Sequence, residues 1–249
     1  MRPAPATLRP TTSAQPFFYE GSELLALADA RNYYRWIAAL CGPHLGTNAL
    51  EIGAGFGTVA AALLERLPEL SLTLVEPASN NLPILRERFS GNRRVTIQAG
   101  YFTGLPDDAR RKDSVLLINV LEHVEDPRLL LEDARKSLRP GGRLVLLVPA
   151  LPSLFGTLDR AFGHRSRFTS ASLATLLRKS GFEPVTTHYV NSLGVIPWFV
   201  LGRIMHRATL RGWEVRLYDR LAIPLLSRLE RRFPPPLGQS LFVVAEPFA

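Results

Sequence analysis

The sequence of 249 residues has little cysteine, little lysine and no long apolar run. Its one cysteine, Cys41, excludes an internal disulfide and a zinc site built from thiolates. The longest apolar stretch, 193–205, is interrupted by Pro197 and Arg203, so it is too short for a membrane-spanning helix of roughly 20 residues. Residues 1–16 contain four prolines and lack the apolar core of a signal peptide. We therefore expect a flexible tail at 1–16 and a cytoplasmic protein.

Because lysine is scarce, arginine supplies most of the positive charge of the chain. Of 30 basic residues only three are lysines, and 22 acidic residues leave a net charge of +8. The excess is local: residues 152–236 carry 13 basic and 5 acidic side chains, whereas residues 1–151 carry 17 and 16. Nucleic-acid binding favours a broad basic track rather than one basic segment, so we expect no nucleic-acid partner.

Short apolar runs alternate with helical patterns from residue 48 onwards, which predicts a parallel sheet with helices on both faces. Several runs are apolar at every position, as strands covered on both faces require. The predicted strands are 48–52, 71–76, 94–99, 113–119, 142–149, 184–191 and 240–245. The predicted helices are 22–41 (with Ser22 as N-cap), 57–67, 79–90, 127–138, 170–181, 193–206 and 216–232.

These elements suggest four parts. We expect a tail at 1–16, an N-terminal lid helix within 17–45, a main domain of 46–191 with 239–249, and a helical cap inserted at 192–238. The insertion is too long for a hairpin loop between the last two strands, which is why we expect it to fold as a cap.

The most informative motif is Glu51-Ile52-Gly53-Ala54-Gly55-Phe56-Gly57, where a strand ends and a helix begins. Glycines there let backbone approach a ligand closely, and strand ends are where α/β sheets bind ligands. Glu51 would repel a pyrophosphate but would suit an ammonium group. Glu76, at the end of the next strand, is placed to accept hydrogen bonds from ribose hydroxyls. The pattern therefore favours a nucleoside ligand with an amino group.

Two further motifs support a family resemblance: 119–127, beginning Asn119-Val120-Leu121-Glu122-His123, and Leu138-Arg139-Pro140-Gly141-Gly142-Arg143. With them, residues 45–191 and 239–246 resemble a class I S-adenosylmethionine-dependent methyltransferase of the small-molecule branch that includes quinone-biosynthesis enzymes. The resemblance implies a Rossmann-like, seven-stranded, mostly parallel sheet with the last strand antiparallel. It also implies S-adenosylmethionine as cofactor and S-adenosylhomocysteine as product.

The resemblance also implies which residues bind the cofactor. In the family, the glycine loop holds the methionine moiety and the acid after the second strand holds the ribose. Where Tyr101 stands, family members usually carry an Asp that binds the adenine amino group, so Tyr101 and Phe102 either form an aromatic wall or Tyr101 lies at the surface. Tyr34 either faces the cofactor from the lid or packs on the core. The full expected set is Tyr34, Glu51, Gly53, Ala54, Gly55, Glu76, Pro77, Tyr101, Phe102, Asn119 and Val120.

Methyl transfer needs alignment of acceptor and cofactor, and it needs a base only where the acceptor loses a proton. His123, after the fourth strand, and His164, in a pattern that resembles a block of the same branch, are the catalytic candidates. Each has an alternative: His123 packs beside the cofactor, or His164 is bonded to Asp159 for structural reasons. The remaining histidines lack ligand spacing, and we predict no metal site.

We expect methyl transfer to a small, partly apolar acceptor at O, N or C, in secondary-metabolite, quinone or cell-envelope biosynthesis. The alternatives are a nucleic-acid methyltransferase and a non-catalytic, cofactor-binding scaffold. Against the first, the chain lacks the Asn/Asp-Pro-Pro-Phe/Tyr signature of base methylation. The apolar, arginine-rich segment 193–232 suits a peripheral membrane contact, an acceptor pocket, a homodimer interface or an ordinary helical cap.

Overall fold

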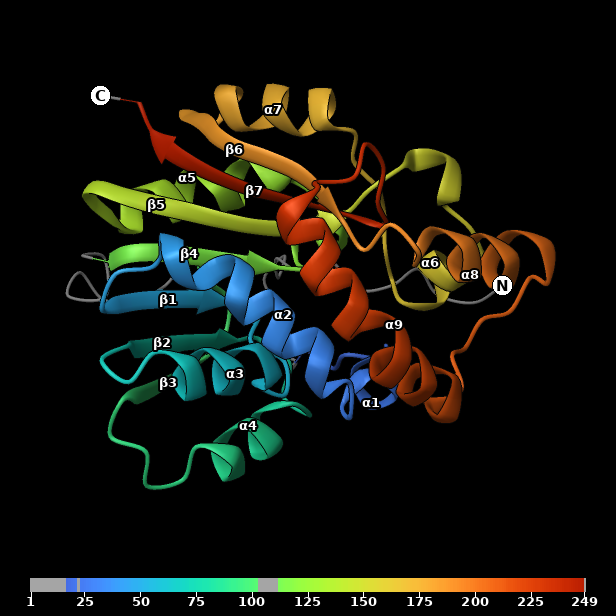
Figure 1. The fold of residues 1–249 in the computed structure, drawn as a ribbon. Helices are drawn as coiled ribbons and strands as arrows, with labels where there is room; N and C mark the ends of the chain where they lie inside the picture. The colour runs from blue at the N-terminus through green and yellow to red at the C-terminus, as the bar shows by residue number, and fades with distance from the viewer. Residues whose placement is uncertain (1–16, 22, 103–111, 249) are drawn as a thin grey trace.

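The computed structural model describes residues 17–21, 23–102 and 112–248, and these fold around one sheet (Figure 1). Within them, seven strands pair in the order β3-β2-β1-β4-β5-β7-β6. All are parallel except β7, which runs antiparallel to both of its neighbours. The predicted Rossmann-like fold is confirmed. The strands are β1 (Asn48–Ile52), β2 (Ser71–Glu76), β3 (Val95–Ala99), β4 (Lys112–Ile118), β5 (Leu138–Pro149), β6 (Phe182–Val190) and β7 (Ser240–Pro247).

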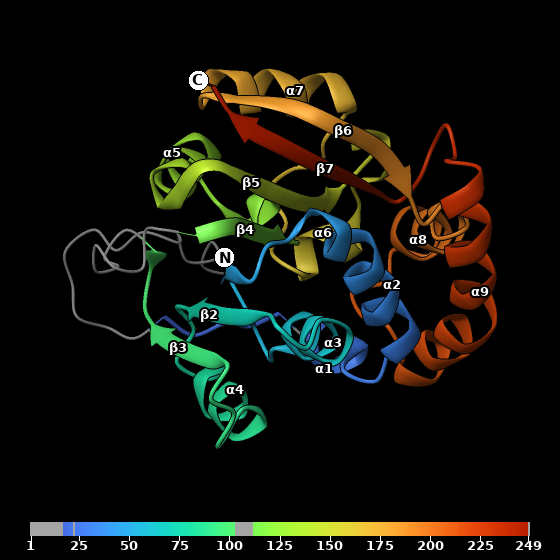
Figure 2. The same cartoon turned by 60° about the vertical axis from the view of Figure 1, so that its left-hand side comes forward.

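Each face of the sheet packs against its own group of helices, because neighbouring strand residues point to opposite faces. In β5, Val145 and Leu147 join one core, and Leu144 and Leu146 join the other. Helices α2 (Arg31–Cys41), α3 (Thr58–Arg66), α4 (Leu82–Arg88) and α9 (Gly212–Arg232) contribute to the first core. Helices α5 (Pro127–Ser137) and α7 (Ser170–Lys179) cover the other face, as Figure 2 shows.

The predicted single helix over 22–41 is wrong, because the segment forms α1 (Glu23–Leu27) and α2, separated by a turn. Asp219, far along the chain in α9, explains where α2 begins. Its carboxylate accepts hydrogen bonds from the backbone N–H groups of Asn32 (3.1 Å) and Tyr33 (2.8 Å). These two N–H groups belong to the first turn of α2, where backbone N–H groups have no acceptor within the helix. The expected cap Ser22 and the tail 1–16 lie outside the described residues.

Strand β5 begins at Leu138 rather than at 142, and a register shift against β4 interrupts its first part. The segment after β5, where the sequence predicts no helix or strand before residue 170, contains two short helices, η5 (Pro152–Leu154) and α6 (Thr157–Ala161). Two other short helices, η1 (Gly42–His44) and η4 (Leu121–His123), follow α2 and β4. The turn at η4 and the loop after α6 carry the two histidine candidates.

The predicted helical insertion between β6 and β7 is confirmed as α8 (Val195–Phe199), the π-helical turn η6 (Val200–Ile204) and α9. Glu230 anchors the far end of α9. Its carboxylate accepts hydrogen bonds from the backbone N–H groups of Asn191 and Ser192, both at 2.8 Å, immediately after β6. Asp219 and Glu230 therefore tie α9 to α2 at one end and to the sheet at the other. Among the described residues, no helix combines the length and the apolar character that crossing a membrane requires.

Candidate functional site

A cavity of about 600 Å³ opens at the carboxyl ends of the parallel strands, beneath α1, α2 and the helical insertion. This is the edge at which open α/β sheets bind ligands. Eleven of the thirteen predicted site residues line it. They are Tyr34, Glu51, Gly53, Ala54, Gly55, Glu76, Pro77, Asn119, Val120, His123 and His164.

The glycine turn after β1 cannot carry larger side chains. Gly53, Gly55 and Gly57 all have positive φ angles, of 75°, 55° and 71°. A Cβ at Gly53 would lie 2.7 Å from Cγ2 of Val120, and one at Gly57 would lie 2.5 Å from the ring of Phe89. The turn therefore brings bare backbone to the cavity wall, where a ligand can approach it closely.

Glu76, at the end of β2, is fixed by backbone on both of its oxygens. The N–H of Gly55 donates to Oε2 at 2.7 Å, and the N–H of Ala78 donates to Oε1 at 2.9 Å. Burial raises the pKa of Glu76, and these bonds, with one from Asn81, act against the shift. The glycine turn and the acid after β2 are thus one hydrogen-bonded unit, with the carboxylate at the cavity.

Glu51 is the penultimate residue of β1 and has a buried carboxylate whose Oε2 finds no hydrogen-bond partner among the described residues. Burial, with a smaller contribution from the charge of Glu76, raises the pKa of Glu51 to about 8. A buried acceptor without a donor is costly, and an ammonium group in the cavity would relieve that cost. The acid set and the glycine turn fit the methionine end and the ribose of S-adenosylmethionine.

Tyr101 and Phe102 stand apart from the main cavity. They line a smaller one of about 70 Å³ on the other side of the wall formed by Gly53, Pro77 and Val120. Phe102 is buried, whereas Tyr101 is partly exposed, with its ring centroid 6.1 Å from that of Phe17. Both alternatives for Tyr101 therefore stay open, and its role at the adenine stays a prediction.

The segment before α1 lies across the end of the cavity. The carbonyl of Phe17 accepts a hydrogen bond from the N–H of Ser79 (2.8 Å). The backbone N–H of Tyr19 donates to the side-chain oxygen of Asn80, and the side-chain amide of Asn80 donates to the carbonyl of Tyr19. Leu24 of α1 lies 3.4 Å from the position that a Cβ on Gly55 would take. The chain before α2 thus closes over the glycine turn as an irregular segment with a short helix.

The other end of the cavity is organised by Asp159, which is fully buried in α6. Its carboxylate accepts hydrogen bonds from Nδ1 of His164 (2.9 Å), Nε of Arg167 (2.7 Å) and Nε1 of Trp198 (3.1 Å). Burial alone would raise the pKa of Asp159, but the bond from His164 and the charge of Arg167 outweigh it and hold the pKa at about 2. Asp159 is therefore a carboxylate at any physiological pH.

That carboxylate determines which nitrogen of His164 carries hydrogen. Because ionised Asp159 only accepts, Nδ1 of His164 must donate, which leaves Nε2 of the neutral ring as a hydrogen-bond acceptor. The imidazole lies parallel to the indole of Trp198, with centroids 6.3 Å apart, and the guanidinium of Arg167 lies 4.9 Å above the same indole. His164 is thus fixed in one tautomer and one orientation at the cavity wall.

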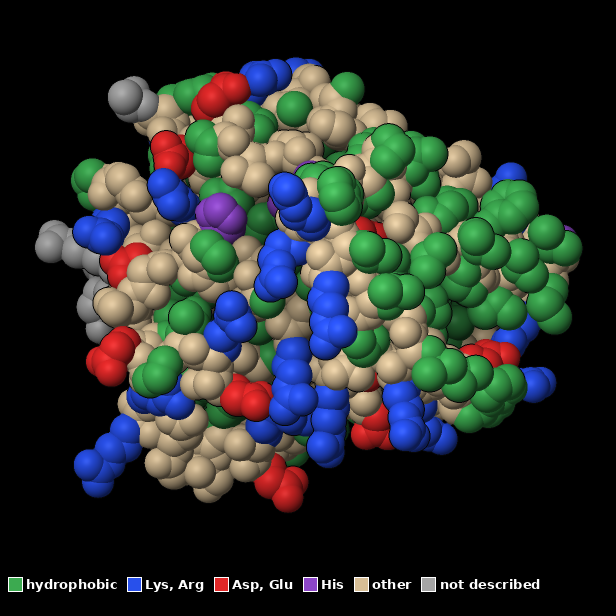
Figure 3. Space-filling view, viewed as in Figure 1, with side chains coloured by type: hydrophobic (Ala, Val, Ile, Leu, Met, Phe, Trp, Pro, Cys, Tyr) green, Lys and Arg blue, Asp and Glu red, His purple; other side chains and the backbone are tan. Residues whose placement is uncertain are grey.

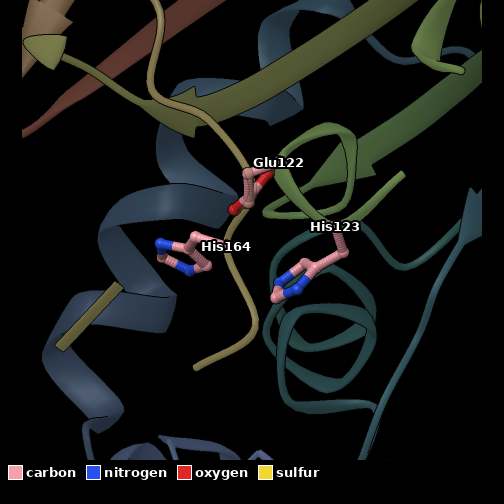
Figure 4. A group of neighbouring side chains, drawn as sticks. All are labelled: Glu122, His123 and His164. Carbon is pink, nitrogen blue, oxygen red and sulfur yellow. The ribbon is translucent and has the colours of Figure 1, made fainter. Parts of the chain in front are cut away.

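His123 packs edge-on to His164, with ring centroids 5.1 Å apart. Burial, with a smaller contribution from His164, lowers the pKa of His123 to about 3. Figure 4 shows these two rings and Glu122 gathered together, and one ligand atom of each lies within 4.8 Å of the others. The sequence did not single out Glu122, and the absence of a metal site stays a prediction.

A profile of the methyltransferase domain family matches residues 24–187, more than half of the chain. The chain belongs to the class I methyltransferase family. Its members use S-adenosylmethionine, so this cofactor is implied for the chain.

Individual relatives of this methyltransferase domain are distant. A protein of transposon TN4556 from Streptomyces fradiae is 32% identical over 149 residues, which cover 59% of this chain and 43% of that protein. A ubiquinone biosynthesis O-methyltransferase from Idiomarina loihiensis is 29% identical over 117 residues, covering 46% and 44%. The chain thus spans less than half the length of these two curated relatives.

Solved structures agree on the fold. A chain in the complex between the Haloferax volcanii Trm112 methyltransferase activator and a methyltransferase superposes with a TM-score of 0.63 at 17% identity. The match covers 95% of this chain and 100% of that one. At this identity the likeness shows the class I methyltransferase fold and no more.

Some residues of the methyltransferase site were not predicted from sequence. Arg167 follows His164 by three residues and Trp198 lies in the apolar run 193–205, but neither position indicates a contact with Asp159. Asp219 lies inside a helical pattern of mixed polarity and has no local signal for capping a distant helix. Each acts through a contact between segments at least eight residues apart, which periodicity does not reveal.

Proposed function

We propose that the chain transfers a methyl group from S-adenosylmethionine to a small, partly apolar acceptor inside the main cavity. The observation that supports this best is that Glu51, Glu76 and the glycine turn line the same cavity as His123 and His164. A volume of about 600 Å³ is within the range of small-ligand sites, which is roughly 300–1,000 Å³.

The cofactor half of the cavity would bind by charge and backbone. Glu51 would accept the ammonium group of the methionine moiety, and Glu76 would accept the ribose hydroxyls while Gly55 holds it in place. Bound here, S-adenosylmethionine supplies an activated methyl group on a sulfonium, so the protein's task is mainly to align the acceptor and to exclude water.

The acceptor half combines an apolar wall with one oriented base. Leu201, Leu217 and Leu221 of the insertion line the cavity, which favours an acceptor with an apolar part. Nε2 of His164 would take the proton of an acceptor hydroxyl or amine, while Asp159 stabilises the resulting imidazolium. The similarity to methyltransferases of ubiquinone and menaquinone biosynthesis supports a ring acceptor of this kind.

His123 would play a different part from His164. With a pKa of about 3, it is neutral and too weakly basic to hold a proton at physiological pH. Its ring also lies 5.9 Å from that of Tyr19, between the closing segment and His164. We assign it to positioning the acceptor, and we assign the segment before α2 and the helical insertion to covering the site.

The experiment is transfer of a tritiated methyl group from S-adenosylmethionine into fractionated cell extract, with and without the protein. We expect label in a small-molecule fraction. His164→Ala should lower this transfer at least a hundredfold while leaving cofactor affinity within about twofold. His206→Asn is the matched control, since His206 is exposed and does not line the cavity. Label in nucleic acid, or equal loss of transfer and affinity in His164→Ala, would refute the proposal.

A further inference from the structure

Helix α9 carries a row of exposed apolar side chains that the site itself does not explain. They recur at every fourth position, and each has between 49% and 69% of its surface exposed. The row consists of Trp213, Leu217, Leu221, Leu225 and Leu229, with Phe233 immediately after the end of the helix. The buried residues of the same helix, such as Ile223 and Leu226, face the core. The row therefore occupies the side of α9 that is turned away from the sheet.

The segment before α9 extends this row into a surface. Ile196 and Phe199 of α8, with Ile204 and Met205 at the end of η6, are also exposed. Figure 3 shows apolar side chains gathered on the side of the molecule where α8 and α9 lie. We call these ten side chains the apolar cap surface. Apolar areas of this kind on a folded domain mark contacts with a partner or a membrane.

Basic residues flank the apolar cap surface and outnumber the exposed acid beside them, Asp29, which lies 3.7 Å from Arg216. Arginines at 203, 211, 216, 220, 228, 231 and 232 are exposed. The three acids of the same segment are occupied: Glu214 pairs with Arg207 at 2.8 Å, and Asp219 and Glu230 are buried as anchors of α9. Figure 3 shows a column of arginine or lysine side chains along the border of the apolar area. The surface therefore suits an apolar partner that is negatively charged at its edge.

The apolar cap surface is continuous with the cavity. Trp213, Leu217 and Leu221 belong to the exposed row and also line the main cavity. Whatever covers the row therefore also lies at the entrance to the site.

We propose that the apolar cap surface docks on an anionic lipid bilayer. Apolar side chains of α8 and α9 would enter the interface, and the arginines would meet the lipid phosphates. A second copy of the chain fits less well, because a symmetric contact through α9 would oppose the arginines of one copy to those of the other. An acceptor dissolved in the membrane could then enter between Trp213 and Leu221. This last consequence rests on the proposed methyl transfer, whereas the docking itself does not.

The test is sedimentation of the full chain with vesicles of phosphatidylcholine, alone or with 30% phosphatidylglycerol, at about 50 and 500 mM NaCl. No substrate is present, so the result is independent of methyl transfer. We expect binding to the anionic vesicles at low salt, and a loss of at least tenfold in the partition coefficient at high salt or without phosphatidylglycerol. Absence of binding to anionic vesicles at low salt would overturn the proposal.

Two pairs of variants identify the surface. Leu225→Glu with Leu229→Glu should reduce the partition coefficient at least tenfold, and Val185→Glu, an exposed apolar residue of β6, should leave it unchanged.

Arg228→Gln with Arg231→Gln should reduce the partition coefficient about 25-fold, at about fivefold for each arginine. Arg86→Gln with Arg88→Gln removes the same charge from α4 and should have less than a third of that effect. Equal effects within either pair would refute docking through the apolar cap surface.

Folding of these variants is checked by thermal unfolding and by binding of S-adenosylhomocysteine, since none of the substituted residues lines the cavity. Sedimentation velocity of the free protein gives the remaining outcome. A monomer supports the proposal, and a stable dimer that Leu225→Glu with Leu229→Glu dissociates would overturn it in favour of a second copy.

Discussion

Nδ1 of His164 lies 2.9 Å from Oδ1 of Asp159, and Asp159 has no exposed surface. This pair joins the catalytic proposal to the stability of the fold, because the same carboxylate also pairs with the buried Arg167 at 2.7 Å. The carboxylate fixes the tautomer of His164 and neutralises the buried guanidinium of Arg167. A substitution at Asp159 should therefore affect both properties.

Asp159→Asn should lower the free energy of unfolding by about 3–5 kcal/mol, because it leaves the Arg167 guanidinium buried without its counter-charge. For a chain of this size, that corresponds to a fall in melting temperature of roughly 6–20 °C. Thermal unfolding followed by circular dichroism measures it. Asp29→Asn, which weakens an exposed pair with Arg216, is the control and should change stability by less than about 1 kcal/mol. An equal effect of the two substitutions would contradict the assignment.

The same ion pair predicts how stability responds to acid. An Asp in an unfolded chain titrates near pH 4, and the pKa of Asp159 is about 2 in the folded protein. Its contribution is fully present above pH 4 and is lost as the pH falls toward 2. Urea unfolding should show that the free energy of unfolding declines between pH 5 and pH 2.5, and that it declines less in Asp159→Asn than in the wild type. Parallel curves for the two proteins would rule out this contribution.

Glu51 should make cofactor binding depend on pH. With a pKa of about 8 in the free protein, the carboxylate is mostly protonated at pH 6 and must lose that proton to accept an ammonium group. Affinity for S-adenosylhomocysteine should therefore rise about tenfold between pH 6 and pH 7. Titration calorimetry measures it. Glu51→Gln should bind more weakly and without this slope, and Glu65→Gln, at an exposed pair with Arg35, should keep the wild-type slope. A slope that persists in Glu51→Gln would assign the titration to another group.

Gly53→Ala and Gly91→Ala form a matched pair, because both positions have positive φ, 75° and 74°. Each alanine costs about 1–2 kcal/mol in the left-handed region. Only at Gly53 does the new Cβ also meet Val120, at 2.7 Å, since nothing lies within 4 Å of a Cβ at Gly91. Gly53→Ala should lose at least tenfold in cofactor affinity, and Gly91→Ala should keep it. Unchanged affinity in Gly53→Ala would remove the turn from the binding site.

Asp219→Ala should loosen the start of α2. The substitution removes the acceptor for the N–H groups of Asn32 and Tyr33, at a cost of about 1–2 kcal/mol. Hydrogen exchange of these two amides should speed up more than exchange in α3, and Asp219→Asn should preserve most of the protection. If exchange at the two amides stayed at the wild-type rate, another group would be capping the helix.

The sequence predicts the sheet and the residues at its strand ends, because local patterns along the chain determine both. The glycine turn, Glu51 and Glu76 lie on consecutive strand ends, so the sheet topology brings them together without further information. His164 and Asp159 are five residues apart, and their contact is one of the two alternatives that the sequence offers for His164. The apolar strands predict the sheet because alternating residues must fill two cores.

What the sequence does not predict depends on contacts between distant segments. The split between α1 and α2 follows from the carboxylate of Asp219 in α9, nearly 190 residues away, where helical periodicity indicates one continuous helix. Trp198 joins the Asp159 cluster only because the insertion folds back over α6. The position of Tyr101 beside a separate small cavity depends on the side chains of three segments.

The central claim is that the main cavity binds S-adenosylmethionine through Glu76 and the glycine turn. Titration calorimetry tests this claim most directly, with the wild type and Glu76→Ala each titrated with S-adenosylmethionine and with NAD. The account predicts one site for S-adenosylmethionine with micromolar affinity, no measurable heat with NAD, and at least tenfold weaker binding in Glu76→Ala. Binding of NAD in place of S-adenosylmethionine, or equal affinity of the wild type and Glu76→Ala, would contradict it.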